Sequence, residues 1–447
     1  MPSDVTVGID IGTSSVKAVA ADADGHVVAS SRVPHEIQIP AADRFQHDAV
    51  RAWRDGPVAA LEALKLESPP DGVSVAAMVP SLTAVDEHGV PQTAGLLYGD
   101  GRGRSASSGA NPIESRELIQ FLRWTQQECP DAAGYWPATA VANHALSGEA
   151  VLDSSTASTA FPLFDWTAWD PDVAGPLGVG IEQLPRLVPT AWEAGRVGGA
   201  DGPVLASGCI DALADQIVAG ADDDGDVLVL LGTTLIVNSV SASHEPVEGY
   251  WVIPHTAKDK FLVGGPSNAG GLFVNWATAP LRDLDAGERA DPGRVPVWAP
   301  YPRGERVPLH DPDRRATLAD LDLTHGAAAL RRAAFEASGF VARRTIDAGR
   351  AAHGVTPRRI IATGGGTRVD EWVQALADCT GLPVECTAVP EGAALGSAFL
   401  ARCALGREPD GMRGAARWAR PGRTIEPDPA WAAAVEDRYV RFLDLSA

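Results

Sequence analysis

The feature that most constrains this chain is a motif that occurs twice: an apolar strand, a Gly-Thr turn and a second apolar strand. The first copy runs from Val5 to Ala21 around Gly12-Thr13-Ser14, and the second runs from Asp226 to Val240 around Gly232-Thr233-Thr234. A turn of small residues between two such runs is typical of a β-hairpin. Because the copies lie about half the chain apart, the sequence predicts two related halves.

The length and the order of elements predict an α/β protein of two domains. At roughly 100–200 residues per domain, 447 residues correspond to two or three domains. The acidic stretch 219–226 separates the two hairpins, so we expect an N-terminal domain at 1–220 and a C-terminal domain at 221–447. Strands alternate with helical patterns in both parts, which predicts α/β layers, and the hairpins make the sheets mixed.

Hydrophobic spacing locates several helices. Apolar residues recur at helical spacing in residues 48–65, and a long amphipathic helix is expected from Ala327 to Ala352. We expect residues 110–150 to be mostly helical, and 160–200 to be irregular because they are rich in Pro, Gly and Trp. Two later helices are expected at 371–380 and 392–403.

The charge balance argues against some partners. With 37 basic and 58 acidic residues, the formal charge is −21. Nucleic acids and anionic membranes both favour a basic surface, so neither is an expected partner. Small anionic ligands stay open, because backbone amides and a bound metal can hold phosphate without a basic surface.

Cysteine usage and the N-terminus predict a cytoplasmic protein. The five cysteines are scattered, without Cys-x-x-Cys or zinc-ligand spacing, so we expect reduced thiols. The N-terminus has neither the basic start nor the apolar stretch of a signal peptide. The longest apolar run, Val227–Val240, is interrupted and shorter than the about 20 residues that span a membrane.

The two Gly-Thr turns are candidate phosphate sites. The amides of small residues in such a turn form a nest for anions, and the hydroxyls of Thr13 and Ser14 add donors. Asp10, which ends the first strand, can hold a hydrated Mg²⁺ beside the nest, and Lys17 lies nearby. One copy alone is better explained as an ordinary hairpin turn. Two copies in two domains are suited to holding a polyphosphate.

Two further motifs carry polar chemistry. Gly364-Gly365-Gly366 follows a strand, but it is not G-x-G-x-x-G and lacks the acidic residue of a dinucleotide site, which disfavours a Rossmann dehydrogenase. These glycines either admit a nucleotide close to the backbone or form a tight packing turn. Asp211 follows a short strand that ends at Gly208. It is either a helix N-cap or a carboxylate that takes a proton from a hydroxyl attacking a phosphoryl group.

In this order, these segments resemble the FGGY-family carbohydrate kinases of the actin-like ATPase superfamily, nearest to the xylulokinase and ribulokinase branch. The likeness covers nearly the whole chain. It extends to Leu146-Ser-Gly-Glu149 with the following 153–158, to Gly304-Glu305-Arg306, to Gln374–Asp378 with Gly381–Val384, and to the segment from Ala393 to Ala398. The resemblance implies two actin-like, ribonuclease H-like domains with an active-site cleft between them, the sugar and phosphate side being N-terminal and the nucleotide side C-terminal.

The resemblance also implies roles for individual residues. Asp211 is similar to the family's general base, and Asp10 is similar to the carboxylate that organises the metal. The expected phosphate and nucleotide contacts are Gly12, Thr13, Ser14, Gly232, Thr233, Gly271, Asn275, Gly364 and Gly365.

The sugar pocket departs from the family pattern. Xylulokinases carry Gln-Met-His-Gly where this chain has Met78-Val79-Pro80-Ser81, and a Pro80 side chain neither donates nor accepts a hydrogen bond. The family's Trp-x-Asp-x-x-Arg is matched by Tyr98, Asp100 and Arg102, with one residue fewer before the arginine. These three residues are candidate sugar contacts, although each can equally be structural. The Arg-Glu pair of glycerol kinases is missing, so the sugar stays open.

We therefore expect an ATP- and Mg²⁺-dependent kinase that phosphorylates a hydroxyl of a small sugar, with a ketopentose resembling xylulose or ribulose as the first choice. A pentitol, a sugar acid or another polyol is the nearest alternative. An alternative of another class is a non-catalytic, ATP-binding regulatory protein of actin-like fold. The expected partners are the sugar and ATP, with a homodimer as the candidate assembly.

Overall fold

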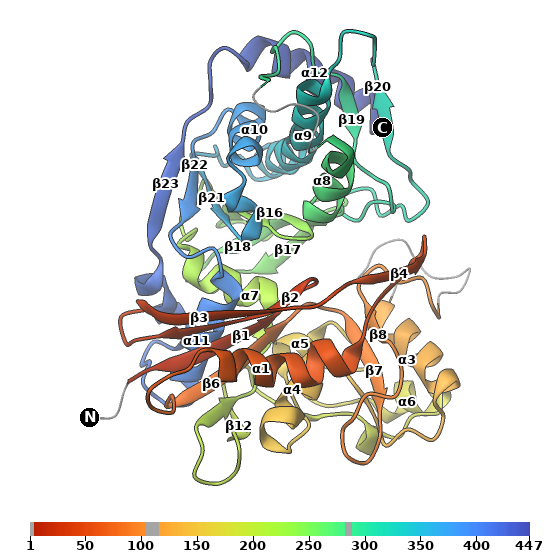
Figure 1. Ribbon diagram of the computed structural model, residues 1–447, viewed down its shortest axis with the longest axis vertical. Helices are drawn as coiled ribbons and strands as arrows, with labels where there is room; N and C mark the ends of the chain where they lie inside the picture. Colours follow the sequence, from red (N-terminus) through yellow and green to blue (C-terminus); the bar gives the residue numbers. More distant parts are fainter. Residues whose placement is uncertain (1–3, 104–115, 282–287) are drawn as a thin grey trace. The chain divides into compact units, whose positions relative to one another are not determined.

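The computed structural model describes residues 4–103, 116–281 and 288–447 (Figure 1). Within it the chain divides into two compact units. The first unit comprises Met1–Val218 and Glu391–Trp418, and the second comprises Ala219–Pro390 and Ala419–Ala447. Each unit is built around its own mixed sheet. No helix among the described residues combines the length and the apolar composition needed to cross a membrane.

The main sheet of the first unit has seven strands in the order β12-β13-β6-β1-β2-β3, with β14 also pairing with β6. Strands β1, β2 and β3 form the expected antiparallel meander, while β6 lies parallel to β1 (Figure 1). The strands are β1 (Thr6–Ile11), β2 (Ser15–Ala21), β3 (Val27–Pro34), β6 (Gly72–Ala77), β12 (Glu193–Arg196), β13 (Val204–Ala206) and β14 (Cys209–Ile210).

A second sheet of the first unit follows the order β4-β5-β8-β7-β9, and β10 and β11 form a separate parallel pair. These strands are β4 (Gln38–Ala41), β5 (Arg44–His47), β7 (Ser81–Val85), β8 (Gly95–Leu97), β9 (Gly134–Trp136), β10 (Val151–Asp153) and β11 (Arg186–Val188). The helices are η1 (Val50–Asp55), α1 (Gly56–Ala63), α3 (Glu117–Glu128), α4 (Ala138–Ser147), α5 (Ser154–Ser158), α6 (Pro171–Ala174), η2 (Gly175–Leu177), η3 (Ile181–Gln183), α7 (Asp211–Ala219), α11 (Gly392–Ala404) and η6 (Gly411–Trp418).

The secondary-structure predictions for this unit are partly wrong. Where they are described, residues 110–150 are mostly helical as predicted, with the short strand β9 between α3 and α4, and residues 110–115 lie outside the described residues. Residues 160–200 hold short helices and strands rather than only irregular connections. Helical spacing in 48–65 is confirmed by η1 and α1.

A single domain boundary at residue 220 does not account for residues Glu391–Trp418. These residues form α11 and η6, which belong to the first unit. Helix α11 packs directly on β1, and a Cβ atom on Gly8 would lie only 1.8 Å from the carbonyl oxygen of Ala394. Only glycine at this strand position allows so close an approach of the helix backbone. The contact joins residues almost 400 positions apart, which chain order cannot reveal.

The second unit has a seven-stranded sheet in the order β17-β18-β16-β15-β21-β22-β23, and β19 and β20 form a separate ribbon. The strands are β15 (Asp226–Leu231), β16 (Leu235–Ser241), β17 (Trp251–Pro254), β18 (Phe261–Ser267), β19 (Val297–Ala299), β20 (Thr317–Ala319), β21 (Arg359–Thr363), β22 (Val384–Thr387) and β23 (Pro421–Ile425). The helices are α8 (Gly271–Thr278), η4 (Ala279–Leu281), α9 (Ala327–His353), η5 (Gly365–Arg368), α10 (Asp370–Thr380) and α12 (Ala432–Leu445).

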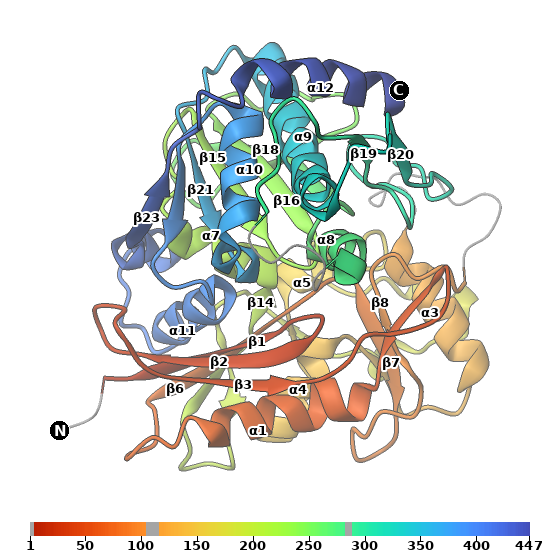
Figure 2. The same ribbon diagram turned by 45° about the horizontal axis from the view of Figure 1, so that its top comes forward.

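Helix α9 confirms the expected long amphipathic helix. Ala334, Ala337 and Val341 on its predicted apolar face are buried in the core of the second unit, and α10 lies beside it (Figure 2). The helix ends at Gly354, whose φ of +69° is the left-handed conformation that commonly terminates helices.

The two units share a core arrangement. In each, the hairpin that carries the Gly-Thr turn contributes its first strand to a parallel pair: β1 pairs with β6, and β15 pairs with β21. The hairpins are β1–β2 and β15–β16. The prediction of two related α/β halves is therefore confirmed at the level of the fold.

Candidate active site

Three strands of the first unit end at one edge of its sheet. Strands β1, β6 and β14 are mutually parallel, and the register aligns Ile11 with Ala77 and Ala77 with Ile210. The next residues on the two outer strands are Gly12 and Asp211. Since neighbouring strands are about 4.8 Å apart, the two chain segments leave the sheet roughly 10 Å from each other. Asp211 and the first Gly-Thr turn (Gly12–Ser14) therefore lie on either side of the end of β6.

Asp10 forms an ion pair across the first hairpin. It is the cross-strand partner of Lys17, whose Nζ lies 3.1 Å from Oδ2 of Asp10. The Asp10 carboxylate raises the pKa of Lys17, and the charges of Asp215 and Glu391 act in the same direction. Lys17 is therefore paired rather than simply solvated.

The surroundings of Asp10 fit a hydrated divalent cation. Asp215 and Glu391 add negative charge near the same lysine, yet among the described residues no group of three His, Cys, Asp or Glu has the arrangement of a metal site. Mg²⁺ commonly takes one or two carboxylates and completes its shell with water and substrate phosphates. Asp10 is thus a chemically suitable ligand, with its remaining partners outside the protein.

The first Gly-Thr turn is closed by its own backbone. The amide of Gly12 donates to the carbonyl of Ser15 at 3.1 Å, so this amide is already bonded in the hairpin. Thr13 is buried, and its Oγ1 lies 3.1 Å from the hydroxyl of Tyr98. Ser14 is exposed at the tip of the turn. Of the three residues predicted here, Ser14 is the one that the turn presents to solvent.

Asp100 and Arg102 form a buried ion pair. The carboxylate of Asp100 is fully buried and accepts the amides of Phe45 at 2.7 Å and Arg102 at 2.8 Å. The guanidinium of Arg102 donates twice to the same carboxylate, at 2.9 and 2.7 Å, and lies over the ring of Trp124. These bonds use the polar groups that sequence reasoning assigned to the sugar. Both residues are therefore bonded within the unit, and a contact with the sugar stays a prediction for them.

Hydrogen bonds connect the strand end before Asp211 to a second aspartate, Asp153. Asp211 is the first residue of α7 and its Oδ1 accepts the amide of Ala212 at 2.7 Å. The preceding amide, of Ile210, donates to Ser155 Oγ at 3.4 Å, and Ser155 donates to Asp153. Asp153 is fully buried, and burial raises its pKa against the opposing effect of these hydrogen bonds. The Asp153–Ser155 pair therefore fixes the strand end that carries Asp211.

In the second unit, two glycine-containing turns also follow the carboxyl ends of neighbouring parallel strands. Strands β15 and β21 are parallel, so the second Gly-Thr turn (Gly232–Thr234) and the Gly364 turn leave the same edge of the sheet. Gly364 has a φ of +91°, and a Cβ there would lie 3.0 Å from the carbonyl oxygen of Leu231. Both restrictions favour glycine, so Gly364 is at least a packing residue.

Helix α8 begins on the second Gly-Thr turn. The amide of Gly271 donates to the carbonyl of Gly232 at 2.8 Å, and the amide of Leu272 donates to the carbonyl of Thr233 at 3.1 Å. Asn275 lies one turn further along α8 with an exposed side chain. The structure therefore brings Gly232, Thr233 and Gly271 together. Asn275 lies outside the hydrogen bonds between α8 and the turn.

An arginine beside this turn was missed by sequence reasoning. Arg306 Nη2 lies 3.1 Å from Thr234 Oγ1. The preceding Glu305 is buried and accepts Ser267 Oγ at 2.7 Å and the Asn268 amide at 2.9 Å, and burial raises its pKa. The Gly-Glu-Arg motif is visible in the sequence, but its contact with the turn 72 residues upstream is not.

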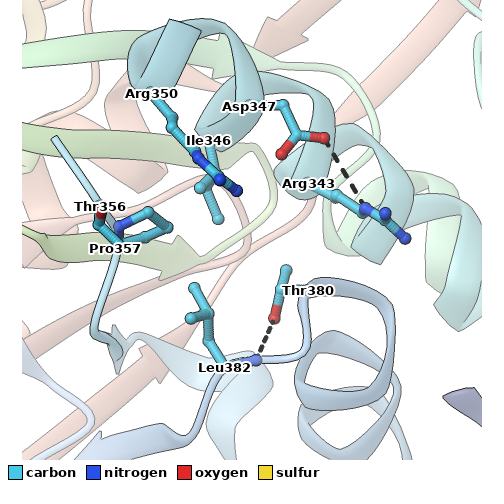
Figure 3. A pocket seen from close by; sticks show the side chains of 8 residues that line it. All are labelled: Arg343, Ile346, Asp347, Arg350, Thr356, Pro357, Thr380 and Leu382. Atoms are coloured by element: carbon cyan, nitrogen blue, oxygen red, sulfur yellow. Dashed lines mark hydrogen bonds and ion pairs between the residues drawn. The ribbon is translucent and has the colours of Figure 1, made fainter. Parts of the chain in front are cut away.

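A pocket of about 210 Å³ lies elsewhere in the second unit (Figure 3). It is lined by Arg343, Ile346, Asp347, Arg350, Thr356, Pro357, Thr380 and Leu382. Thr356 and Pro357 precede β21, whereas Gly364 follows it, so the pocket faces the opposite edge of the sheet. It is therefore separate from the Gly-Thr turn.

Comparison with known proteins gives the family. Residues 5–200 match the N-terminal domain of the FGGY family of carbohydrate kinases, and residues 227–405 match its C-terminal domain. The chain is 26% identical to the xylulose kinase of Escherichia coli (strain K12), covering 90% of each protein. It is 24% identical to a gluconokinase of Bacillus licheniformis, covering 90% of this chain and 88% of that protein.

Solved structures show the same fold. The gluconate kinase of Lactobacillus acidophilus superposes with a TM-score of 0.79 at 21% identity, covering 99% of this chain and 97% of that one. The xylulose kinase of Rhodospirillum rubrum superposes with a TM-score of 0.76 at 25% identity, covering 99% and 98%.

Two α/β units, each with a Gly-Thr hairpin within its main sheet, define the two-domain architecture of the actin-like ATPases. The chain belongs to the FGGY family of carbohydrate kinases. It is accordingly a sugar kinase, and kinases of this family use ATP.

Proposed function

We propose that the enzyme transfers the γ-phosphoryl group of ATP to a hydroxyl of a small sugar, with Asp211 as general base. The observation that carries this is the placement of Asp211 and the first Gly-Thr turn at one sheet edge, with a single strand between them. A hydroxyl held against Asp211 can lose its proton to the carboxylate while it attacks the γ-phosphoryl group of an ATP molecule whose phosphate chain the turn contacts.

The local structure supports this role for Asp211. The residue begins α7, where the helix dipole stabilises negative charge. The bond from Ala212 to Oδ1, together with the Ser155 support of Ile210, restrains the carboxylate. Positioning of this kind contributes much of the rate in phosphoryl transfer, because the protein takes part in little covalent chemistry.

Mg²⁺ is the proposed metal, with Asp10 as its protein ligand. When bound with the nucleotide, the ion would neutralise charge that develops on the phosphates. Lys17 would stay close to Asp10 and add a second positive charge near the turn. In the second unit, Thr233 and Arg306 are the side chains proposed to face the nucleotide phosphates, with Gly271, Asn275, Gly364 and Gly365 lining its site.

A ketopentose resembling xylulose or ribulose is the first proposed acceptor. A sugar acid is a specific second candidate, because relatives of both kinds, xylulose kinases and gluconokinases, match this chain at similar identity. A pentitol or another polyol remains a third. Tyr98 is the proposed sugar contact, whereas the mutual pairing of Asp100 and Arg102 argues for a supporting role.

The division of substrate binding between the two domains remains a prediction, as do a cytoplasmic location and a homodimer. In the proposal, the first unit serves the sugar and the phosphate, and the second unit serves the nucleotide.

The test begins with a coupled ADP-release screen of the wild-type enzyme over ketopentoses, aldoses, pentitols, gluconate and glycerol. With the best acceptor, Asp211→Asn should lower kcat by about 10²–10⁴ and leave ADP affinity unchanged. Asp170→Asn is the matched control, since Asp170 also caps a helix of the first unit. Wild-type turnover by Asp211→Asn would exclude Asp211 as the base. ATP binding without turnover on any acceptor would favour the regulatory alternative.

A further inference from the structure

His47, the last residue of β5, is completely buried beneath the first Gly-Thr turn. Both ring nitrogens are hydrogen-bonded: Nδ1 lies 3.0 Å from Nε1 of Trp53, and Nε2 lies 2.8 Å from the carbonyl oxygen of Thr13. An indole N–H can only donate, so Nδ1 must accept. The proton of the neutral ring is therefore on Nε2, which donates to Thr13.

The environment keeps this ring neutral. Burial, and then the neighbouring His35, lower the pKa of His47 to about 4. The two imidazoles meet edge to face with their centroids 4.5 Å apart. His35 also acts on the turn, because its backbone amide donates to the carbonyl of Ser14 at 3.1 Å. The carbonyls of two consecutive turn residues are thus held, that of Thr13 by the His47 ring and that of Ser14 by the backbone amide of His35.

Holding a carbonyl orients the amide that follows it. In a planar trans peptide the C=O and the next N–H point in opposite directions. The Thr13 carbonyl faces the buried His47 ring, so the N–H of Ser14 is turned away from that ring. Ser14 is the exposed residue of the turn, and a donor directed outward there is what an anion-binding nest requires.

We infer that His47 is a positioning residue for the phosphate-binding turn, acting as the Nε2–H tautomer to hold the Thr13 carbonyl and direct the Ser14 amide toward the phosphate. This inference rests on the proposed phosphate role of the turn. Trp53 takes part indirectly, because its indole N–H bonds the bare Nδ1 and so restrains the ring in the tautomer that the Thr13 carbonyl also requires.

The first test reads the tautomer directly. A long-range ¹H–¹⁵N spectrum of the wild-type protein with ¹⁵N-labelled histidine distinguishes a bare ring nitrogen from a protonated one. At pH 7 we expect His47 to have a bare Nδ1 and a protonated Nε2. A protonated Nδ1, or a doubly protonated ring, would overturn the inference without any mutation.

The second test measures ADP affinity by calorimetry in the presence of Mg²⁺, which needs no knowledge of the sugar. His47→Leu removes both hydrogen bonds and should weaken ADP binding at least tenfold. In His47→Gln, the amide can donate to Thr13 and accept from Trp53, so affinity should return to within about threefold of wild type. Wild-type affinity in a folded His47→Leu protein would overturn the inference, and so would failure of His47→Gln to restore it.

Trp53→Phe is the variant to use if His47→Leu does not fold. It keeps an aromatic ring in the core but removes the N–H that bonds Nδ1. The Thr13 carbonyl can only accept, so the ring should keep its proton on Nε2, but with one restraint fewer we expect ADP binding to weaken. Unchanged ADP affinity, or a proton on Nδ1, would overturn the inference.

His255→Leu is the matched control for loss of a buried histidine. His255 has the same bonding pattern, with Nε2 2.9 Å from the Ala221 carbonyl and Nδ1 accepting the Ala257 amide at 2.7 Å. It follows Pro254, which pairs through Phe261 with Ser241, the end of β16 remote from the second Gly-Thr turn. His255→Leu should lower stability but not ADP affinity.

Failure of the proposed phosphate role and failure of the His47 inference would give different ADP affinities in the variants. If the turn does not bind phosphate, both Thr13→Ala and His47→Leu will keep wild-type ADP affinity while the spectrum still reports the Nε2–H tautomer. If only the role of His47 is wrong, Thr13→Ala will weaken ADP binding and His47→Leu will not.

Discussion

The hydroxyl of Tyr98 lies 3.1 Å from Oγ1 of Thr13, and both side chains are buried. Tyr98 directly follows β8 and is the proposed sugar contact, whereas Thr13 belongs to the proposed phosphate turn. The bond therefore joins the two proposed subsites within one unit. A sugar that displaces or reorients the tyrosine would be sensed at the phosphate site.

This contact predicts energetic coupling between the two residues. Tyr98→Phe and Thr13→Val each remove one hydroxyl with little change of shape, and a buried hydrogen bond is worth about 0.5–1.5 kcal/mol. A double-mutant cycle on the free energy of unfolding should give a coupling energy of about 1 kcal/mol. Additive effects would argue against the coupling. Tyr135→Phe is the control, because Tyr135 is a buried tyrosine whose hydroxyl bonds the Cys129 carbonyl instead.

Asp10→Asn should change the dependence on magnesium. The amide keeps the size of the carboxylate but loses the charge that a hydrated cation requires. We expect the Mg²⁺ concentration for half-maximal activity to rise about tenfold or more. Activity measured over a magnesium titration provides the check. An unaltered titration curve would remove Asp10 as the metal ligand.

His47 should make stability depend on pH. Its pKa falls from 6.5 in the unfolded chain to about 4 in the fold. A lowered folded-state pKa means that the stabilisation is complete above pH 6.5 and is lost as the pH falls toward 4. The difference is about 3 kcal/mol. His47→Gln does not titrate, so the wild type should lose about that much unfolding free energy relative to the variant between pH 7 and pH 4.

Urea denaturation of both proteins at several pH values measures this difference. Because most other groups titrate alike in the two proteins, their contributions largely cancel. If the unfolding free energies of wild type and His47→Gln changed equally with pH, that result would contradict a buried, neutral histidine.

The second unit contains a buried charge cluster whose loss should be costly. Glu336 accepts Arg332 at 2.8 Å and is held by two bonds from Arg438, at 2.7 and 2.8 Å. All three side chains are at most 10% exposed. Removing one partner from such a cluster leaves uncompensated charge, so Glu336→Gln should lose about 3 kcal/mol of unfolding free energy.

Glu436→Gln is the control for this cluster, because Glu436 makes a single exposed ion pair with Arg343 at 2.7 Å. Exposed pairs contribute about 0–1 kcal/mol, so this variant should stay close to wild type. Equal losses in Glu336→Gln and Glu436→Gln would mean that burial does not decide the cost.

The sequence by itself determined the features that depend on neighbours in the chain. The two Gly-Thr hairpins, the long helix α9 and the α/β class all follow from local hydrophobic spacing and turn chemistry. For the same reason, Asp10 and Asp211 could be recognised as candidates, since each stands at the end of a strand with a small-residue turn or a helix beside it. Their catalytic roles remain predictions.

Only the tertiary structure decided what depends on residues far apart in the chain. Packing on Gly8 assigned α11 to the first unit. Side-chain bonds over long separations paired Thr13 with His47 and placed Arg306 beside Thr234. Local patterns identify polar groups but not whether other parts of the chain already satisfy them. Buried polar groups must find partners, and the folded chain supplies those partners from any distance in sequence.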